Sequence, residues 1–386
     1  MKRIYLDNAA TSWPKPDVVY AAVDRYLREN GAPAGRSAYR EAAEAENAIA
    51  SARSSIARLI GADNARQIVF TFNGTGALNL AIHGLLRRGD HAICTDADHN
   101  SVLRPLRYLE EHGGIEVTRV TCNTAGWIDR DDIRRALRPS TRLIAMLHAS
   151  NVTGAVQPVA DVVEIAHKNG ARFLLDAAQS LGHWPVSVKE LPIDLLAAPG
   201  HKGLLGPLGT GLLYIRDGLE KEIQSTVQGG TGTQSNEDRQ PESVPDKYES
   251  GNHNVPGLVG LAAALGWLEA RGVGAICRHE KELADALREG LRRIPAVKLH
   301  GPSEGQLAVA VVSISIDGYD PQEAAAVLDS AFGIQVRAGL HCAGRLHAAL
   351  GTLASGGSIR FSIGAFNTHS DIEVALSAVG EMARGK

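Results

Sequence analysis

The sequence predicts an α/β fold in which a mainly parallel sheet of seven strands lies between helices, followed by a smaller α+β unit. Between about residues 67 and 215, short apolar runs alternate with segments of helical periodicity. Most runs are almost continuously apolar, as expected for strands that are buried on both faces of a parallel sheet. The seven predicted strands are QIVFTF, HAICT, IEVTRVT, RLIAMLHAS, RFLLDAA, IDLLAAP and TGLLYI.

A polar, glycine-rich segment at about 228–254 separates this region from the rest of the chain. Loops of this length are usually functional or disordered. Two long helical patterns follow, and the alternating runs VAVVSISI and IQVRAG then predict half-buried antiparallel strands. We therefore expect a large α/β domain over 15–255. A small α+β domain is expected over 256–386, together with the N-terminal segment 1–14.

Composition excludes several classes of function. The chain has 386 residues, 44% of them hydrophobic and 22% charged, which is ordinary for a globular protein. A formal charge of −3 gives no electrostatic reason to expect nucleic acid or an anionic membrane as a partner. The N-terminus lacks a signal-peptide core, and no apolar run reaches membrane-spanning length. Because the four cysteines form no CxxC pair, neither a disulfide framework nor a metal site is expected. The cytoplasm is the predicted compartment.

Polar residues follow the predicted strands at the edge where ligands bind in such sheets. The turn Gly74-Thr75-Gly76 links a strand to a helix, and its backbone N–H groups and the Thr75 hydroxyl suit a phosphate. Glycines that only shape the turn are the alternative. The turn does not fit the dinucleotide-binding fingerprint, because Asn79 takes the place of the third glycine.

Asp176 and Lys202 end two strands that we expect to lie close together and to open on the same edge. A lysine amine can form a Schiff base with an aldehyde, and a carboxylate can keep a pyridine nitrogen protonated so that the ring accepts electrons. Taken alone, Asp176 is better explained as a helix N-cap, and a solvated loop charge is the alternative for Lys202. A phosphate turn, an acid and a lysine in this order are what pyridoxal phosphate requires.

The sequence resembles the cysteine desulfurase / selenocysteine lyase family, within the class V aminotransferase group of fold-type I pyridoxal-phosphate enzymes. The resemblance covers nearly the whole chain. The motifs that carry it are IYLDNAATS, DHNSVLRP, ASNVTGAVQP, LLDAAQS, PGHKG, VRAGLHCA and SIRFSIGAFNT.

This resemblance implies pyridoxal 5'-phosphate as a Schiff base on Lys202, with Asp176 at the ring nitrogen and His99 stacked on the ring. The ring hydroxyl would contact Gln179 and Asn151, and the phosphate would contact Gly74, Thr75, Gly76 and His201. Arg360, Arg337 and Asn151 would hold the substrate. Two positions depart from the commoner pattern: Pro199 replaces a hydroxyl residue, for which Thr231 or Thr233 could compensate, and Asn252 stands where relatives often have threonine.

Cys342 distinguishes the possible reactions. It follows a strand in a glycine-containing loop beside histidines, where a thiolate can be favoured. The resemblance implies that the thiol attacks the sulfur of L-cysteine, giving alanine and a persulfide on Cys342. It also implies a homodimer, a sulfur-acceptor protein and activity on selenocysteine. An aminotransferase or a C–S lyase acting on another amino acid without a persulfide is the alternative, and a scaffold without activity is a third.

Overall fold

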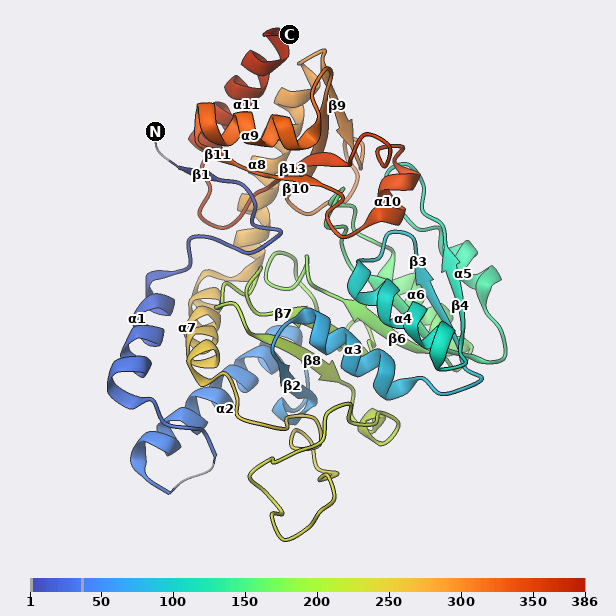
Figure 1. Cartoon of the computed structure of the whole chain (residues 1–386), viewed down its shortest axis with the longest axis vertical. Coiled ribbons are helices and arrows are strands. Elements are labelled where there is room, and N and C mark those ends of the chain that lie inside the picture. Colours follow the sequence, from blue (N-terminus) through green and yellow to red (C-terminus); the bar gives the residue numbers. More distant parts are fainter. Residues whose placement is uncertain (1–2, 36–37, 386) are drawn as a thin grey trace.

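The centre of the molecule is a seven-stranded sheet with the strand order β2-β8-β7-β6-β5-β3-β4 (Figure 1). The computed structural model describes residues 3–35 and 38–385. β8 is antiparallel to β2 and to β7, and the other neighbours in the sheet are parallel. Each of the seven predicted runs forms one strand, so the predicted fold class is confirmed. The strands are β2 (Ile68–Thr71), β3 (His91–Thr95), β4 (Glu116–Val120), β5 (Thr141–Leu147), β6 (Arg172–Asp176), β7 (Leu195–Pro199) and β8 (Gly211–Ile215).

Alternate side chains of these strands enter two different cores, one on each face of the sheet. In β6, Phe173 and Leu175 belong to the larger core, whereas Leu174 belongs to the other. Because both faces are covered, the strands are apolar along nearly their whole length. The helices of this region are α1 (Asp17–Arg25), α2 (Arg40–Ile60), α3 (Gly74–Leu85), α4 (Asn100–His112), α5 (Arg130–Ala136), α6 (Val159–Lys168) and α7 (Val255–Arg271).

A smaller unit carries both described ends of the chain (Figure 1). Its four-stranded antiparallel sheet has the order β12-β13-β10-β9, and a separate parallel pair joins β1 to β11. The elements are β1 (Ile4–Tyr5), α8 (Val273–Arg292), β9 (Val297–His300), β10 (Val311–Ile316), α9 (Pro321–Phe332), β11 (Ile334–Gln335), β12 (Arg337–Gly339), α10 (Gly344–Ala349), β13 (Ser358–Ser362) and α11 (His369–Arg384).

The small unit corrects two expectations about strands. The run IQVRAG was predicted to form one antiparallel strand, and this prediction was wrong. The run forms two strands in different sheets, β11 and β12, and β11 is parallel to β1. β10 is buried at five of its six residues, more than a half-buried strand would be. The division of the chain into a large domain (15–255) and a small domain (256–386 together with 1–14) remains our proposal. Ile4 and Leu6 pack in the same core as residues of β10, which favours placing the N-terminal segment in the small domain. Residues 1, 2 and 386 of those ranges lie outside the described residues.

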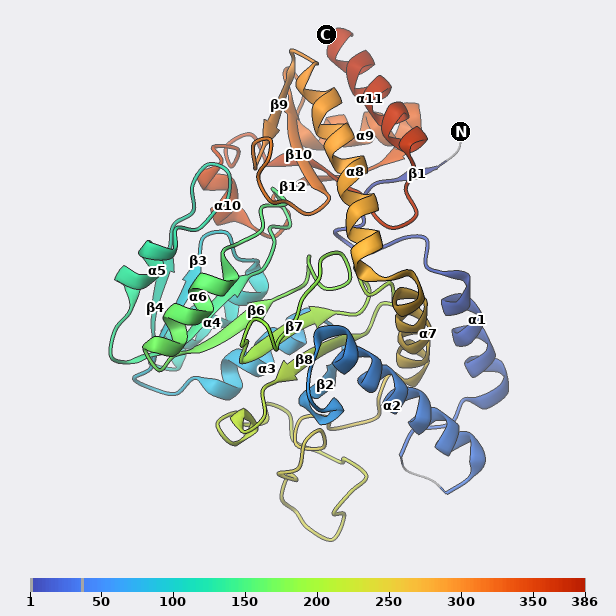
Figure 2. The ribbon, with the colours of Figure 1, turned by 180° about the vertical axis from the view of Figure 1, so that it is seen from behind.

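The two units are joined by α7 and α8, which meet at Gly272 (Figure 2). Among the residues that the structure describes, no single helix has both the length and the apolar composition to cross a membrane. These two helices meet those limits only as a pair, by length and composition alone, and the pair is bent by 80°.

The segment 228–254 extends from the large unit on the side away from the small one (Figures 1 and 2). Its end is tied to the sheet by Glu249, which accepts hydrogen bonds from Arg53 Nη1 at 2.7 Å, Arg53 Nη2 at 2.8 Å and the Phe70 backbone at 2.6 Å. The side chains of Arg53 and Glu249 are only 11% and 4% exposed, so this is a buried ion pair.

Candidate active site

Lys202 lies in a turn whose backbone is held by hydrogen bonds from Ser12 and Lys15 of the N-terminal segment. The Lys202 carbonyl accepts hydrogen bonds from Leu205 N at 2.8 Å and Ser12 Oγ at 3.0 Å. The His201 carbonyl accepts from Ser12 N and from Lys15 Nζ at 2.8 Å. A Cβ atom on Gly200 would lie 2.2 Å from Thr210 Oγ1, so only glycine fits there. The breaker-rich sequence thus gives a fixed turn rather than a solvated loop.

The Lys202 side chain is partly buried and lies close to Asp176. β6 and β7 are parallel neighbours, so the residues that follow them open on one edge. Burial lowers the pKa of Lys202 to about 8, and Asp176 opposes this shift. Burial raises the pKa of Asp176, opposed by the Ala178 N–H and by Lys202. Asp176 Oδ1 accepts from Ala178 N at 2.9 Å, and because residues 177–184 contain turns and an isolated bridge but no helix, Asp176 is not the cap of a helix.

One cavity gathers the side chains predicted for the cofactor. Gly76 is the exception: its N–H donates to Asn73 Oδ1 at 2.8 Å, and it borders a different hollow, with Phe72 and Asn252. Pro199 lines the cavity and, as expected, offers it neither a hydroxyl nor an N–H. The predicted residues that line the cavity are Gly74, Thr75, His99, Asn151, Asp176, Gln179, His201 and Lys202.

His99 caps α4 and is held in one neutral form. Its Nδ1 accepts from Ser101 N at 3.0 Å, so in the neutral ring the proton is on Nε2. Burial, then Lys202, lowers the pKa of His99 to about 4. Ser101 Oγ also contacts His99 Nδ1 at 2.9 Å and Thr75 Oγ1 at 2.8 Å, which connects two sides of the cavity. Ser101 was not among the predicted site residues, although it lies within the motif DHNSVLRP.

Three buried polar atoms in and beside the cavity have no hydrogen-bond partner among the residues that the structure describes: Asn151 Oδ1, His201 Nδ1 and Arg360 Nε. Buried polar atoms are hydrogen-bonded in the great majority of cases. Asn151 and His201 line the cavity itself. Their free atoms indicate a polar ligand, and they fit the hydroxyl and phosphate groups of pyridoxal phosphate.

The two arginines predicted for the substrate are cross-strand neighbours, since Arg337 of β12 pairs with Arg360 of β13. Arg360, whose side chain is 1% exposed, donates to Asp7 Oδ1 at 2.7 Å and to the Asn151 carbonyl at 3.0 Å. Burial lowers the pKa of Arg360, and Asp7 opposes that shift. Asp7 was also missed, although it stands in the motif IYLDNAATS.

Of the four cysteines, Cys342 is the exposed one. Burial raises the pKa values of the other three thiols, that of Cys122 to about 11. Cys122 lies two residues after β4, where it forms an isolated bridge with Ile128. His341 and Cys342 both have left-handed backbones, with φ of 51° and 58°, which costs roughly 1–2 kcal/mol for each residue.

The neighbours of Cys342 differ from those expected. Arg337 Nη2 lies 3.9 Å from Sγ and can donate to it. The histidines expected to favour a thiolate are buried, and burial lowers the pKa values of His341 to about 2 and of His347 to about 4. Both are therefore neutral, and the positive group beside the sulfur is the guanidinium.

The amino-acid sequence matches a known protein family. The family described as Aminotransferase class-V matches residues 4–374. The chain belongs to the class V aminotransferase family. Pyridoxal phosphate is the cofactor that this family implies, in agreement with the free polar atoms of the cavity.

Relatives of this class V aminotransferase chain carry a more specific description. A probable cysteine desulfurase of Methanothermobacter thermautotrophicus is 35% identical, over 98% of this chain and 94% of that protein. An apo cysteine desulfurase structure from Thermococcus onnurineus NA1 matches with a TM-score of 0.93 and 34% identity, covering 100% of this chain and 95% of that one. The cysteine desulfurase CsdA from Escherichia coli, in an S-sulfonic acid form, has a TM-score of 0.89 and 29% identity and covers 99% and 95%.

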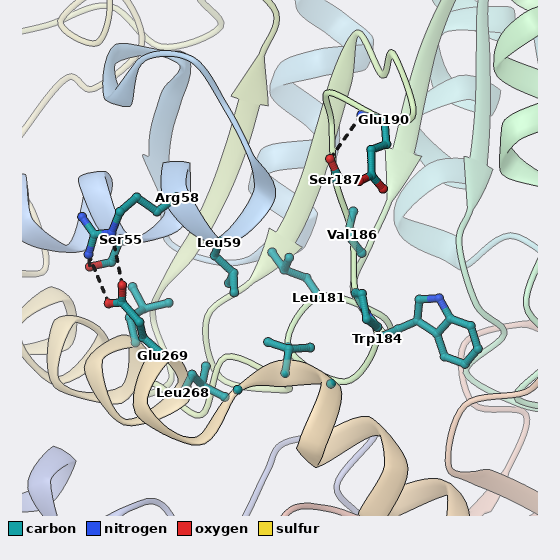
Figure 3. A pocket seen from close by; sticks show the side chains of 16 residues that line it. Ser55, Arg58, Leu59, Leu181, Trp184, Val186, Ser187, Glu190, Leu268 and Glu269 are labelled. Atoms are coloured by element: carbon teal, nitrogen blue, oxygen red, sulfur yellow. Dashed lines mark hydrogen bonds and ion pairs between the residues drawn. The ribbon is translucent and has the colours of Figure 1, made fainter.

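A second cavity of the class V aminotransferase chain lies between α2, α7 and the segment after Leu181 (Figure 3). Arg58 Nη2 donates to Ser55 Oγ at 2.9 Å and to Glu269 Oε2 at 3.2 Å, so these polar groups satisfy one another. None of the residues predicted for the active site lines this cavity. In the described part of the chain, no group of three or more His, Cys, Asp or Glu side chains is placed to hold a metal ion.

Proposed function

We propose that the protein is a pyridoxal-phosphate-dependent cysteine desulfurase. Cys342 carries the proposal, because it is exposed and its loop is hydrogen-bonded to residues at the cavity. Asn151, which lines the cavity, donates from Nδ2 to the His341 carbonyl at 2.7 Å, and Asn100, which follows the cavity residue His99, donates from its backbone N to the Cys342 carbonyl at 3.0 Å. The names of the relatives support the same activity. Selenocysteine would be a second substrate.

In the sulfur-transfer step, the Cys342 sulfur attacks the sulfur of L-cysteine. The S–S bond of a persulfide forms and the substrate Cβ–S bond breaks. The electron pair of that bond stays with the three-carbon skeleton, which takes up a proton and leaves as L-alanine. A thiol of an acceptor protein must then collect the outer sulfur, and the exposure of Cys342 permits this.

Lys202 and Asp176 would hold the cofactor, which supplies an electron sink when bound. With its pKa lowered to about 8, the Lys202 amine can lose and regain a proton near neutral pH. The neutral His99 ring would cover one face of the bound ring. Arg337 and Arg360 would bind the substrate carboxylate, a task suited to guanidinium groups.

The substitution Cys342→Ser tests this function, with Cys277→Ser as the matched control on α8. We expect Cys342→Ser to retain the cofactor and lose nearly all sulfide release from L-cysteine, because a serine hydroxyl is a poor acceptor for sulfur; some selenocysteine lysis would survive. Mass spectrometry of the wild type should find one extra sulfur on the Cys342 peptide. Unchanged sulfide release in Cys342→Ser would favour direct elimination by a C–S lyase, and transamination without sulfide would favour an aminotransferase.

Lys202→Ala tests the proposed anchor. We expect this variant to lose the visible absorption of the bound cofactor and all turnover. Treatment with borohydride should fix the cofactor on the wild type and not on the variant. A cofactor still fixed by borohydride in Lys202→Ala would mean that another lysine is the anchor.

We further propose a cytoplasmic homodimer. Phe72 and Val227 are 61% and 59% exposed and border one hollow at the base of the 228–254 segment, a pattern that favours an interface. Thr231 and Thr233 line another hollow there, and Asn252 borders both hollows. Because all three residues lie outside the Lys202 cavity, any contact they make with a phosphate would be to the partner's site. Light scattering tests this proposal: we expect a dimer that Val227→Asp weakens, whereas a fully active wild-type monomer would rule it out.

A further inference from the structure

Behind Cys342 lies a chain of buried polar groups that the proposed function does not use. Thr352 Oγ1 is 2.7 Å from His347 Nδ1, His347 Nε2 is 3.3 Å from His341 Nδ1, and His341 Nε2 is 3.3 Å from the Arg337 carbonyl. His341, His347 and Thr352 are 3%, 0% and 4% exposed. The chain links the α10 region to the residue directly before Cys342.

The hydrogen bonds that link Thr352, His347, His341 and the Arg337 carbonyl can have only one donor-to-acceptor direction. The Arg337 carbonyl can only accept, so His341 Nε2 must carry a proton. In the neutral ring His341 Nδ1 is then an acceptor, and His347 Nε2–H donates to it. His347 Nδ1 is left as an acceptor, and the Thr352 hydroxyl donates to it. Each ring therefore has one tautomer, which the Arg337 carbonyl requires at one end and the Thr352 hydroxyl matches at the other.

We propose that Thr352 and His347 are positioning residues for Cys342, which act by fixing the orientation and tautomer of His341. The inference rests on the proposed function, in which Cys342 receives sulfur. His341 and Cys342 are consecutive non-glycine residues with left-handed backbones, a conformation that persists only where surrounding contacts enforce it. Asn151 and Asn100 hold the two carbonyls of this pair, and the chain from Thr352 holds the side chain of His341.

Thr352→Val is the test, because valine keeps the shape of threonine and removes only the hydroxyl. The backbone of Thr352 is fixed independently, since its N–H donates to the His347 carbonyl and its carbonyl accepts from Gly357, both at 2.9 Å. Thr352→Ser retains the donor and is the conservative variant. Ser355→Ala, which removes a hydrogen bond of 3.0 Å from Oγ to the Thr352 carbonyl, is a control in the same segment.

With cofactor-loaded enzyme, we expect Thr352→Val to lower kcat for sulfide release from L-cysteine roughly tenfold while KM changes less than twofold, because a small misplacement of a reacting group is costly in rate. Thr352→Ser and Ser355→Ala should stay within twofold of the wild type. His347→Leu should lose more activity than His347→Gln, because a carboxamide offers a donor and an acceptor in nearly the same places as the imidazole.

Alkylation of Cys342 by iodoacetamide gives a readout that does not depend on turnover. The rate at pH 7 should fall several-fold in Thr352→Val and not in Thr352→Ser, because the sulfur leaves its contact with Arg337. The proposal is wrong if Thr352→Val matches the wild type in kcat and alkylation, if only KM changes, or if Thr352→Ser is equally impaired. A wild type that releases no sulfide would instead refute the proposed function, and the alkylation rates would still decide the role of Thr352.

Discussion

Asn151 donates a hydrogen bond of 2.7 Å from its Nδ2 to the carbonyl oxygen of His341. Through this bond, a residue that lines the cofactor cavity holds the backbone next to the exposed thiol. The Asn151 carbonyl in turn accepts from Arg360 Nη1 at 3.0 Å. One residue therefore connects the three parts of the proposed site, which are the cofactor cavity, the substrate arginine and the cysteine loop.

Asn151→Asp is expected to damage this connection without changing the size of the side chain. A carboxylate cannot donate, so one of its oxygens would face the His341 carbonyl and repel it. We expect sulfide release to fall about 100-fold, as for other displacements of reacting groups. Asn169→Asp is the control, because it alters a similar 2.8 Å bond, from Asn169 Nδ2 to the Ile165 carbonyl, outside the site. Equal activity in the two variants would contradict the role given to Asn151.

The lowered pKa of the partly buried Lys202 should make the stability of the apoprotein depend on pH. Its pKa is about 8 in the folded chain against an ordinary 10.5, so between these values the unfolded chain binds more protons. Stability therefore rises with pH in this window; as pH falls, it is lost from about 10.5 downward, and the loss is complete near 8. Relative to Lys202→Met, wild-type apoprotein should gain about 3 kcal/mol between pH 8 and 10.5. Urea unfolding of both proteins measures this difference, and a difference that does not vary with pH would contradict the prediction.

The large sheet and the core of the site could be predicted because they depend on local patterns. Asp176 ends β6 and Lys202 lies in the turn after its parallel neighbour β7, and the apolar runs mark both strands directly. Asp7 could not be assigned a partner, since Arg360 lies 353 positions away. The same holds for the Asn151–His341 bond, which spans 190 positions. The strand β13 was missed although Ser-Ile-Arg-Phe-Ser alternates between polar and apolar residues; this alternation predicts one solvent-facing side, whereas all five residues are buried.

Glu249→Gln should destabilise the protein strongly. Glu249 forms two hydrogen bonds with Arg53 and one with the Phe70 backbone, all in a buried position. A neutral amide leaves the Arg53 charge unpaired and turns an NH2 group toward a donor, which costs about 3 kcal/mol or more. Glu269→Gln is the control, because the Arg58–Glu269 pair is about 60% exposed at both ends and is worth roughly 1 kcal/mol at most. Urea midpoints at one protein concentration should separate the variants, and similar midpoints would show that the buried pair is not important.

Gly200→Ala should affect the site through the backbone of the turn that carries Lys202. A methyl group at position 200 would lie 2.2 Å from Thr210 Oγ1 and 2.9 Å from Thr210 Cβ, so the turn must move. The Gly200 N–H donates to the Thr210 carbonyl at 2.8 Å, and the Gly200 carbonyl accepts from Gly206, so the shift would be transmitted to the residues between them.

We expect Gly200→Ala to bind the cofactor at least tenfold more weakly and to lose at least tenfold in sulfide release, since Lys202 would no longer be aimed into the cavity. Gly266→Ala in α7 is the control: nothing lies within 4 Å of the added methyl, and alanine is favoured over glycine in a helix by about 1 kcal/mol. That variant should be fully active and at least as stable as the wild type. Titration of each apoprotein with pyridoxal phosphate, followed by visible absorption, measures the difference. If Gly200→Ala takes up the cofactor as tightly as Gly266→Ala, the close contact with Thr210 does not set the position of Lys202, and the clamp formed by Ser12 and Lys15 would have to suffice.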